Sequence, residues 1–177
     1  MGFSLADVPK GSIRSLLGNQ AVSSGAIAVA TVTSKVQIVS TIYYTVDGVW
    51  CSKGATDNFW TLPATVSLIP AGGSTPPLTI SSAFGSLTDT ATTTRYFFLG
   101  LTAAGAAVAY MSNPPNTAAA SQDETILPAF ANGVTIVGIL KVTVAAGTVF
   151  TPGTTLLGAA GVTVTYTNVS MLPVSLP

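Results

Sequence analysis

Side chains able to do chemistry are few and scattered in this sequence. The 177 residues include six acidic and six basic side chains, one cysteine and no histidine. The adjacent pair Asp123 and Glu124 is the one carboxylate cluster. Glycoside hydrolysis needs two carboxylates about 5–10 Å apart that face a common bond, whereas neighbours on an extended segment point in opposite directions. We therefore expect this pair to lie on a solvated loop.

The remaining reactive residue types also lack partners. Cys51 follows Trp50 in a strand-like run, with no histidine to activate it, so we expect an inert buried thiol. Asp47, Asp57 and Asn58 could offer oxygen atoms to calcium, but they lack the Asp-x-Asp-x-Asp-Gly spacing of a calcium loop. Serine or cysteine relays and zinc sites need side chains that are missing. The sequence favours a protein that is not an enzyme and uses no cofactor or metal.

Low charge indicates what the surface contacts. Charged residues make up 7% of the chain and the net charge is zero, whereas about 25% is usual in soluble domains. A nucleic-acid partner would require clustered Lys and Arg, so we expect none. Because zero net charge removes repulsion between copies, we expect much of the surface to face other protein in a large assembly. A soluble monomer with a threonine-rich coat is the alternative.

The sequence also argues against a membrane partner. The charge-free stretch 142–177 alternates apolar with polar residues and contains three prolines, whereas a membrane-spanning helix needs about 20 consecutive apolar residues. Asp7 and Lys10 interrupt the place where a signal peptide would have its apolar core. A single cysteine fits synthesis in a reducing cytoplasm.

Residues 1–20 differ from the rest of the chain and carry its one convincing helix signal. Ser12 can cap a turn over 13–17, and Gly18 stands where a helix would end. Such a short helix is unstable alone, so the apolar side chains of the segment must dock, on the same chain or on a neighbour. We expect residues 1–20 to be a docking arm and 21–177 to be one domain. The docking candidates are Phe3, Leu5, Val8, Ile13, Leu16 and Leu17.

From residue 21 onward apolar residues alternate with polar ones, which predicts strands. The run 36–46 is followed by Asp47-Gly48 and then by 49–51, a strong signal for a hairpin. A second hairpin is expected from 96–101 to 107–111, and long strands over 134–144 and 162–169. Shorter strands are expected over 26–33, 65–69, 78–82 and 148–150, and a surface loop over 112–128. We predict an all-β fold, an antiparallel β-sandwich or jelly-roll-like barrel.

Three aromatic residues lie close together in the sequence. Trp50 and Trp60 flank residues 52–59, which resemble the end of one strand, a loop and the start of the next. Trp60 and Phe59 could stack on a sugar ring. Aromatic side chains are, however, more commonly buried in a core or at a subunit contact. We therefore expect Trp50, Phe59 and Trp60 to lie in the core or at an interface.

Three phrases carry a resemblance to a known class of proteins. They are Thr-Ile-Tyr-Tyr-Thr-Val-Asp-Gly-Val-Trp at 41–50, Lys-Gly-Ala-Thr-Asp-Asn-Phe at 53–59, and Phe-Thr-Pro-Gly-Thr-Thr-Leu-Leu-Gly-Ala-Ala-Gly-Val-Thr-Val-Thr-Tyr at 150–166. In these and in its composition the chain resembles small virion structural proteins of tailed bacteriophages, most of all capsid decoration (cement) proteins.

The resemblance implies a role that requires no chemistry. It implies a homotrimer on the capsid surface of the virion that is made in the host cytoplasm, binds the major capsid protein and stabilises the shell. No functional residue of such proteins is carried over to a position here. The alternative is a carbohydrate- or receptor-binding β module of a phage tail or fibre, which would need an exposed Trp60.

Overall fold

The computed structural model describes residues 18–23, 25–68, 78–88, 90–112 and 130–170. The described residues form an all-β, antiparallel structure and no helix. The helix expected over 13–17 lies outside them, as does most of the loop expected over 112–128. The strands are β1 (Gln20–Ala21), β2 (Ile27–Val29), β3 (Lys35–Ile38), β4 (Ile42–Val46), β5 (Val49–Lys53), β6 (Thr56–Thr61), β7 (Thr65–Leu68), β8 (Leu78–Ser81), β9 (Thr93–Thr102), β10 (Ala107–Met111), β11 (Val134–Val144) and β12 (Val162–Asn168).

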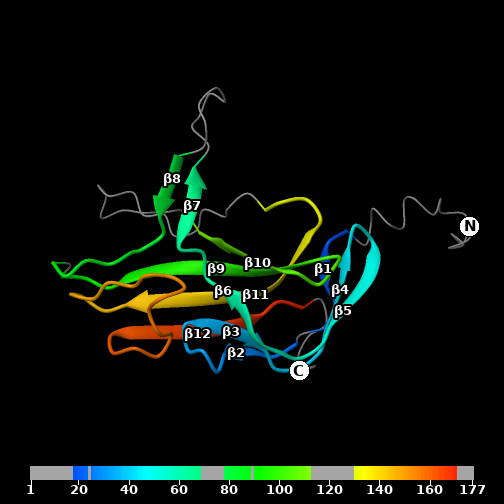
Figure 1. Cartoon of the computed structure of the whole chain (residues 1–177), viewed down its shortest axis with the longest axis horizontal. Coiled ribbons are helices and arrows are strands. Elements are labelled where there is room, and N and C mark those ends of the chain that lie inside the picture. Colours follow the sequence, from blue (N-terminus) through cyan, green and yellow to red (C-terminus); the bar gives the residue numbers. More distant parts are fainter. Residues whose placement is uncertain (1–17, 24, 69–77, 89, 113–129, 171–177) are drawn as a thin grey trace, which may run out of the picture.

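A four-stranded sheet in the order β10-β9-β11-β12 is the largest element (Figure 1). The β9–β10 hairpin, with Leu101 opposite Ala107, was predicted. β11 and β12 were predicted as strands, and the structure pairs them with each other from Val144 to Gly138. The alternation places Phe97, Leu99 and Leu101 of β9 on one buried face. That face is where the rest of the protein packs.

Two three-stranded sheets, β2-β3-β6 and β1-β4-β5, cover this buried face. Hydrogen bonds tie them to it: the Trp60 indole donates to the Gly100 carbonyl, and the Tyr44 hydroxyl to the Thr102 carbonyl. The predicted single run over 36–46 is in fact two strands, because the chain bends at residues 39–41 and passes from one sheet to the other. The alternating apolar residues of the run, Val36, Ile38, Ile42, Tyr44 and Val46, are nonetheless buried on both strands.

One hydrophobic core joins the three sheets. It contains side chains of β1 to β4 and β6 on one side and of β9 to β12 on the other. Phe84, Phe97 and Phe150 meet at one end with ring centroids 5.3 to 6.5 Å apart, and Phe84 and Phe150 also form a β-bridge. Within the part of the chain that is described, each sheet ends in edge strands and none closes on itself. The barrel alternative is therefore not found there.

Three short elements differ from the sequence predictions. β6 occupies residues that the sequence indicated as largely a loop, and it pairs with β3 through a register shift between Val36 and Ile38. The strand expected over 26–33 is limited to β2, and that expected over 148–150 is only the Phe150 bridge. β7 and β8 pair only with each other and project from the body (Figure 1).

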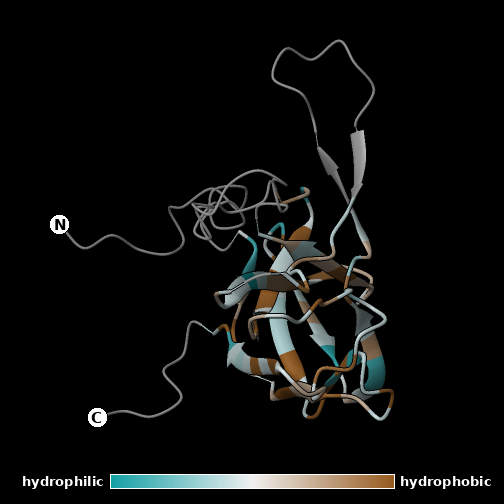
Figure 2. Ribbon diagram, turned by 90° about the vertical axis from the view of Figure 1, so that its left-hand side faces the viewer, coloured by the Kyte–Doolittle hydropathy of each residue, from teal (hydrophilic) through white to brown (hydrophobic). Residues whose placement is uncertain are grey.

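The described surface carries few strongly hydrophilic residues. Figure 2 shows the ribbon mostly in white and brown, with short hydrophilic stretches. Among the described residues there is no helix of the length and apolar character that a membrane span requires.

Candidate functional site

The β4–β5 hairpin is the part of the described surface with the most distinctive features. Its turn residues Asp47 and Gly48 have φ values of 50° and 73°, as a two-residue hairpin turn of this kind requires. The preceding segment holds this turn in place. The side-chain oxygen of Asn19 accepts a hydrogen bond from the Asp47 amide at 2.6 Å, and the Gly18 carbonyl accepts one from the Gly48 amide at 3.1 Å.

The two faces of this hairpin have opposite environments. Ile42, Tyr44 and Val46 of β4 point into the core. On the other face Tyr43 is 51% exposed and Trp50 is 62% exposed, and the strand register makes them diagonal neighbours. Val49, beside the turn, is 49% exposed but pairs with Val46, so it lies on the opposite face. We call Tyr43 and Trp50 the apolar strip.

Tyr44 and Cys51 form the cross-strand pair beneath the apolar strip. The Tyr44 hydroxyl donates to the Thr102 carbonyl at 2.9 Å. Burial, and secondarily the nearby Cys51, raises the pKa of Tyr44 above its usual value. Cys51 is a free, half-buried thiol that packs against the core. This arrangement anchors the hairpin on the four-stranded sheet.

The other two aromatic candidates lie elsewhere. Trp60 is fully buried, and its indole N–H donates to the Gly100 carbonyl at 3.0 Å. Phe59 is half-buried. The centroid of its ring lies 4.7 Å from the Trp60 ring centroid and 4.7 Å from the Lys53 Nζ atom. Trp60 was expected in the core or at an interface, and it lies in the core; stacking on a sugar, the alternative considered for it, is excluded because the core encloses the side chain. Of the two tryptophans, the structure brings only Trp50 to the surface.

The six predicted docking residues of the arm and the carboxylate pair lie outside the described residues. They are Phe3, Leu5, Val8, Ile13, Leu16, Leu17, Asp123 and Glu124.

Asp57 and Asn58 act as structural residues in β6. One Asp57 carboxylate oxygen accepts hydrogen bonds from the amides of Thr31 and Asn58 at 3.0 and 2.8 Å. The Asn58 side chain accepts one from the Val32 amide at 2.8 Å. Hydrogen bonds from Thr31 hold the pKa of Asp57 below its usual value. The pair thus fastens the turn between β2 and β3. No group of three potential metal ligands occurs among the described residues.

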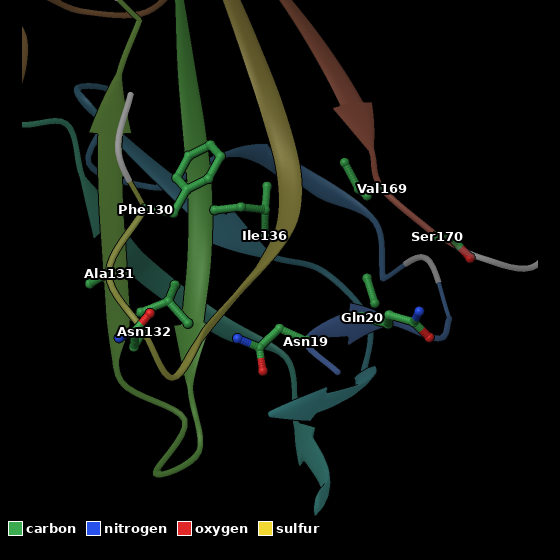
Figure 3. A pocket seen from close by; sticks show the side chains of 10 residues that line it. Asn19, Gln20, Phe130, Ala131, Asn132, Ile136, Val169 and Ser170 are labelled. Atoms are coloured by element: carbon green, nitrogen blue, oxygen red, sulfur yellow. The ribbon is translucent and has the colours of Figure 1, made fainter. Parts of the chain in front are cut away.

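A groove of about 510 Å³ lies beside the start of β11 (Figure 3). Apolar side chains of Phe130, Ile136 and Val169 line it together with polar ones of Asn132 and Ser170. The Phe130 ring is 38% exposed and packs edge-on against Phe98 and Tyr110, with centroids 5.4 and 5.2 Å apart. This combination offers an aromatic surface with hydrogen-bonding groups around it.

The exposure of Tyr43 was not predicted from the sequence, although the alternation of 36–46 places its side chain on the face opposite that of Ile42 and Tyr44. The groove brings together segments near residues 20, 132 and 170, and no local motif marks such a meeting. Comparison with protein-family models, curated proteins and solved structures finds no match to this chain.

Proposed function

We propose that this chain is a non-enzymatic virion structural protein that decorates a phage capsid and stabilises it by binding the lattice of the major capsid protein. The observation that carries the proposal is the apolar strip, in which large side chains remain exposed on a chain with few charges. Exposed apolar groups that cluster are typical of protein–protein contacts. The resemblance in residues 41–50, which include both residues of the apolar strip, points to the same role.

The physical requirements of that role are modest. A decoration protein stabilises a shell by mass action, because it binds the assembled lattice and not the separated subunits. Apolar and backbone contacts repeated by symmetry are sufficient. With few charges, Coulomb attraction contributes little, so attachment should tolerate salt. The two layers of sheet around one core support the sandwich form of the predicted fold.

Co-sedimentation with shells tests this function. Shells would be assembled from the major capsid protein of the same genome and mixed with the full chain. We expect the protein to pellet with shells and to raise their melting temperature. Attachment should persist from roughly 0.1 M to 1 M salt, over which the screening length falls from about 10 Å to about 3 Å. A protein that stays in the supernatant at all salt concentrations contradicts the proposal.

A deletion variant examines the predicted arm in the same experiment. The deletion should end at residue 17, because Gly18 and Asn19 hold the β4–β5 turn and Gln20 belongs to β1. We expect the shortened protein to keep its β structure but to pellet with fewer shells. If the full chain and the shortened chain bind shells equally, residues 1–17 do not act as a docking arm.

The groove favours a second candidate, a carbohydrate- or receptor-binding module of a tail or fibre. Sugar sites commonly combine an aromatic ring with amide and hydroxyl groups, and Phe130, Asn132 and Ser170 supply these here. A glycan array with the full chain tests it, with Phe130→Ala as the variant and Trp50→Ala as the control. Binding abolished only by Phe130→Ala would support this candidate over capsid decoration.

A further inference from the structure

The outer edge of β5 has main-chain groups available for pairing. β5 is the last strand of the sheet β1-β4-β5, and within the described ranges no strand lies beyond it (Figure 1). The Tyr43 carbonyl accepts hydrogen bonds from the amides of Val22 and Ser23, so the main chain of Tyr43 faces β1. Its cross-strand partner Ser52 therefore turns its N–H and C=O away from β4. By the same alternation Trp50 does so too.

We propose that β5 pairs antiparallel with β5 of a second copy of the chain, about a two-fold axis at Cys51. Exposed apolar edge strands are templates for pairing with another chain, and a two-fold contact uses the same surface on both copies. Centring the pair on Cys51 places Trp50 opposite Ser52 of the second copy, so every outward N–H and C=O of these residues is bonded. A centre at Trp50 or Ser52 would satisfy one outward residue instead of two.

The side chains fit this register. Trp50 and Trp50 of the second copy become diagonal neighbours on the same face, a spacing at which aromatic rings make contact. The rings then cover surface that is 62% exposed in the single chain. The uncharged Ser52 opposite Trp50 leaves room for them.

The charges near the edge also favour a second copy as the partner. Lys53 faces Val49 of the second copy, which keeps the two lysines apart. Asp47 lies diagonal to Lys53 of the second copy, so opposite charges are neighbours on each side of the axis. Asp47 and Lys53 are the only charged residues from 36 to 56, and neither meets its own kind across the axis.

This inference rests on the proposed assembly role and specifies which partner occupies the apolar strip. The β5–β5 pairing produces a homodimer, whereas the resemblance to phage decoration proteins implies a homotrimer. Contact with the lattice is then left to other surfaces, including the predicted arm.

Cys51 provides a direct test of the register. Opposed residues between hydrogen-bonded pairs have Cα atoms about 4.5 Å apart, within the range of about 4.4–6.8 Å that a disulfide spans. Diamide, a diazene oxidant, would take up two protons and two electrons and become a hydrazine as the two thiols form one disulfide. We expect the purified full chain to give a covalent dimer rapidly, at a rate that follows the dimer fraction measured by analytical ultracentrifugation.

The matched control moves the cysteine by one residue. In the double variant Cys51→Ser, Ser52→Cys the thiol lies opposite Trp50 of the second copy and is more exposed than Cys51. We expect at least tenfold slower cross-linking. Equal or faster cross-linking would mean that disulfides form by random collision and would overturn the proposed register.

Charge substitutions test the surface itself. Trp50→Asp should abolish the dimer in ultracentrifugation and slow the cross-linking of Cys51, with an unchanged circular dichroism spectrum. Val39→Asp, at a site 50% exposed but outside β5, should do neither. A full chain that is monomeric at all concentrations overturns the pairing. Shell binding without dimers would overturn only the pairing, and dimers without shell binding only the capsid role.

Discussion

The two tryptophans, ten positions apart, show how one residue type serves opposite purposes in this fold. Trp60 lies in β6, is fully buried and donates its N–H to the Gly100 carbonyl across the core. Trp50 lies in β5, is 62% exposed and has solvent beyond it. The difference comes from the face on which each side chain lies, because β5 and β6 are both the last strands of their sheets. Trp60 points from β6 into the core, whereas Trp50 lies on the face of β5 that is turned away from it. A tryptophan therefore contributes to folding at one site and is available for association at the other.

Replacing each tryptophan by alanine should give the largest contrast. Trp60→Ala removes a large core side chain and leaves a cavity, so we expect the free energy of unfolding to fall by about 3–5 kcal/mol. Trp50→Ala removes a surface side chain and should change it by no more than about 0.5 kcal/mol. Urea unfolding at a concentration where the chain is monomeric measures both.

Equal losses of unfolding free energy in Trp60→Ala and Trp50→Ala would contradict the different roles assigned to the two tryptophans. Should Trp60→Ala not accumulate in folded form, Trp60→Phe keeps most of the packing and should still lose more stability than Trp50→Phe. An equal loss would mean that Trp50 is buried by contacts within its own chain.

The adjacent tyrosines repeat the contrast on one strand. Tyr44→Phe removes the hydrogen bond to the Thr102 carbonyl. That carbonyl keeps the Gly105 amide as a donor, so we expect a loss of about 1 kcal/mol. Tyr43→Phe, on the exposed face, should be close to neutral. Thermal unfolding of both variants checks this, and a larger loss for Tyr43→Phe would contradict the assignment of faces.

Local sequence signals predicted the elements that local chemistry determines. The Asp47-Gly48 pair predicted its hairpin because both residues must adopt positive φ, and the structure confirms it. The alternation over 36–46 puts Val36, Ile38, Ile42, Tyr44 and Val46 on one face, and these residues are buried on both strands into which the run divides. The long strands β11 and β12 were also predicted from the alternation of apolar and polar residues, and the structure confirms them.

Long-range contacts account for what the sequence did not predict. Asp57 and Asn58 look like loop residues, yet they lie within β6, where Asn58 has a φ of 52° and both bind a turn 26 positions away. The burial of each tryptophan depends on which face of its strand packs against the four-stranded sheet, and local periodicity does not determine how the sheets pack. The groove likewise depends on segments that are distant in the sequence.

The smallest effect concerns Asp57 and depends on pH. Because its pKa is lowered on folding, its carboxylate stabilises the fold above the unfolded-state pKa of about 3.9, and that contribution is lost as pH falls through the folded-state value. Asp57→Asn keeps an oxygen for the Thr31 amide but removes the charge. We expect the melting temperature of the variant to be slightly below that of the original chain at about pH 7, and the difference to shrink as the pH falls through the folded-state pKa of Asp57.

Asp57→Ala is the matched variant for this measurement. Alanine removes the hydrogen bonds to the amides of Thr31 and Asn58 as well as the charge, so part of its deficit in melting temperature should persist at acidic pH, where that of Asp57→Asn shrinks. A gap between Asp57→Asn and the original chain that stays constant from neutral to acidic pH would show that the charge of Asp57 does not fasten the β2–β3 turn. In that case the hydrogen-bonding geometry alone would hold the turn.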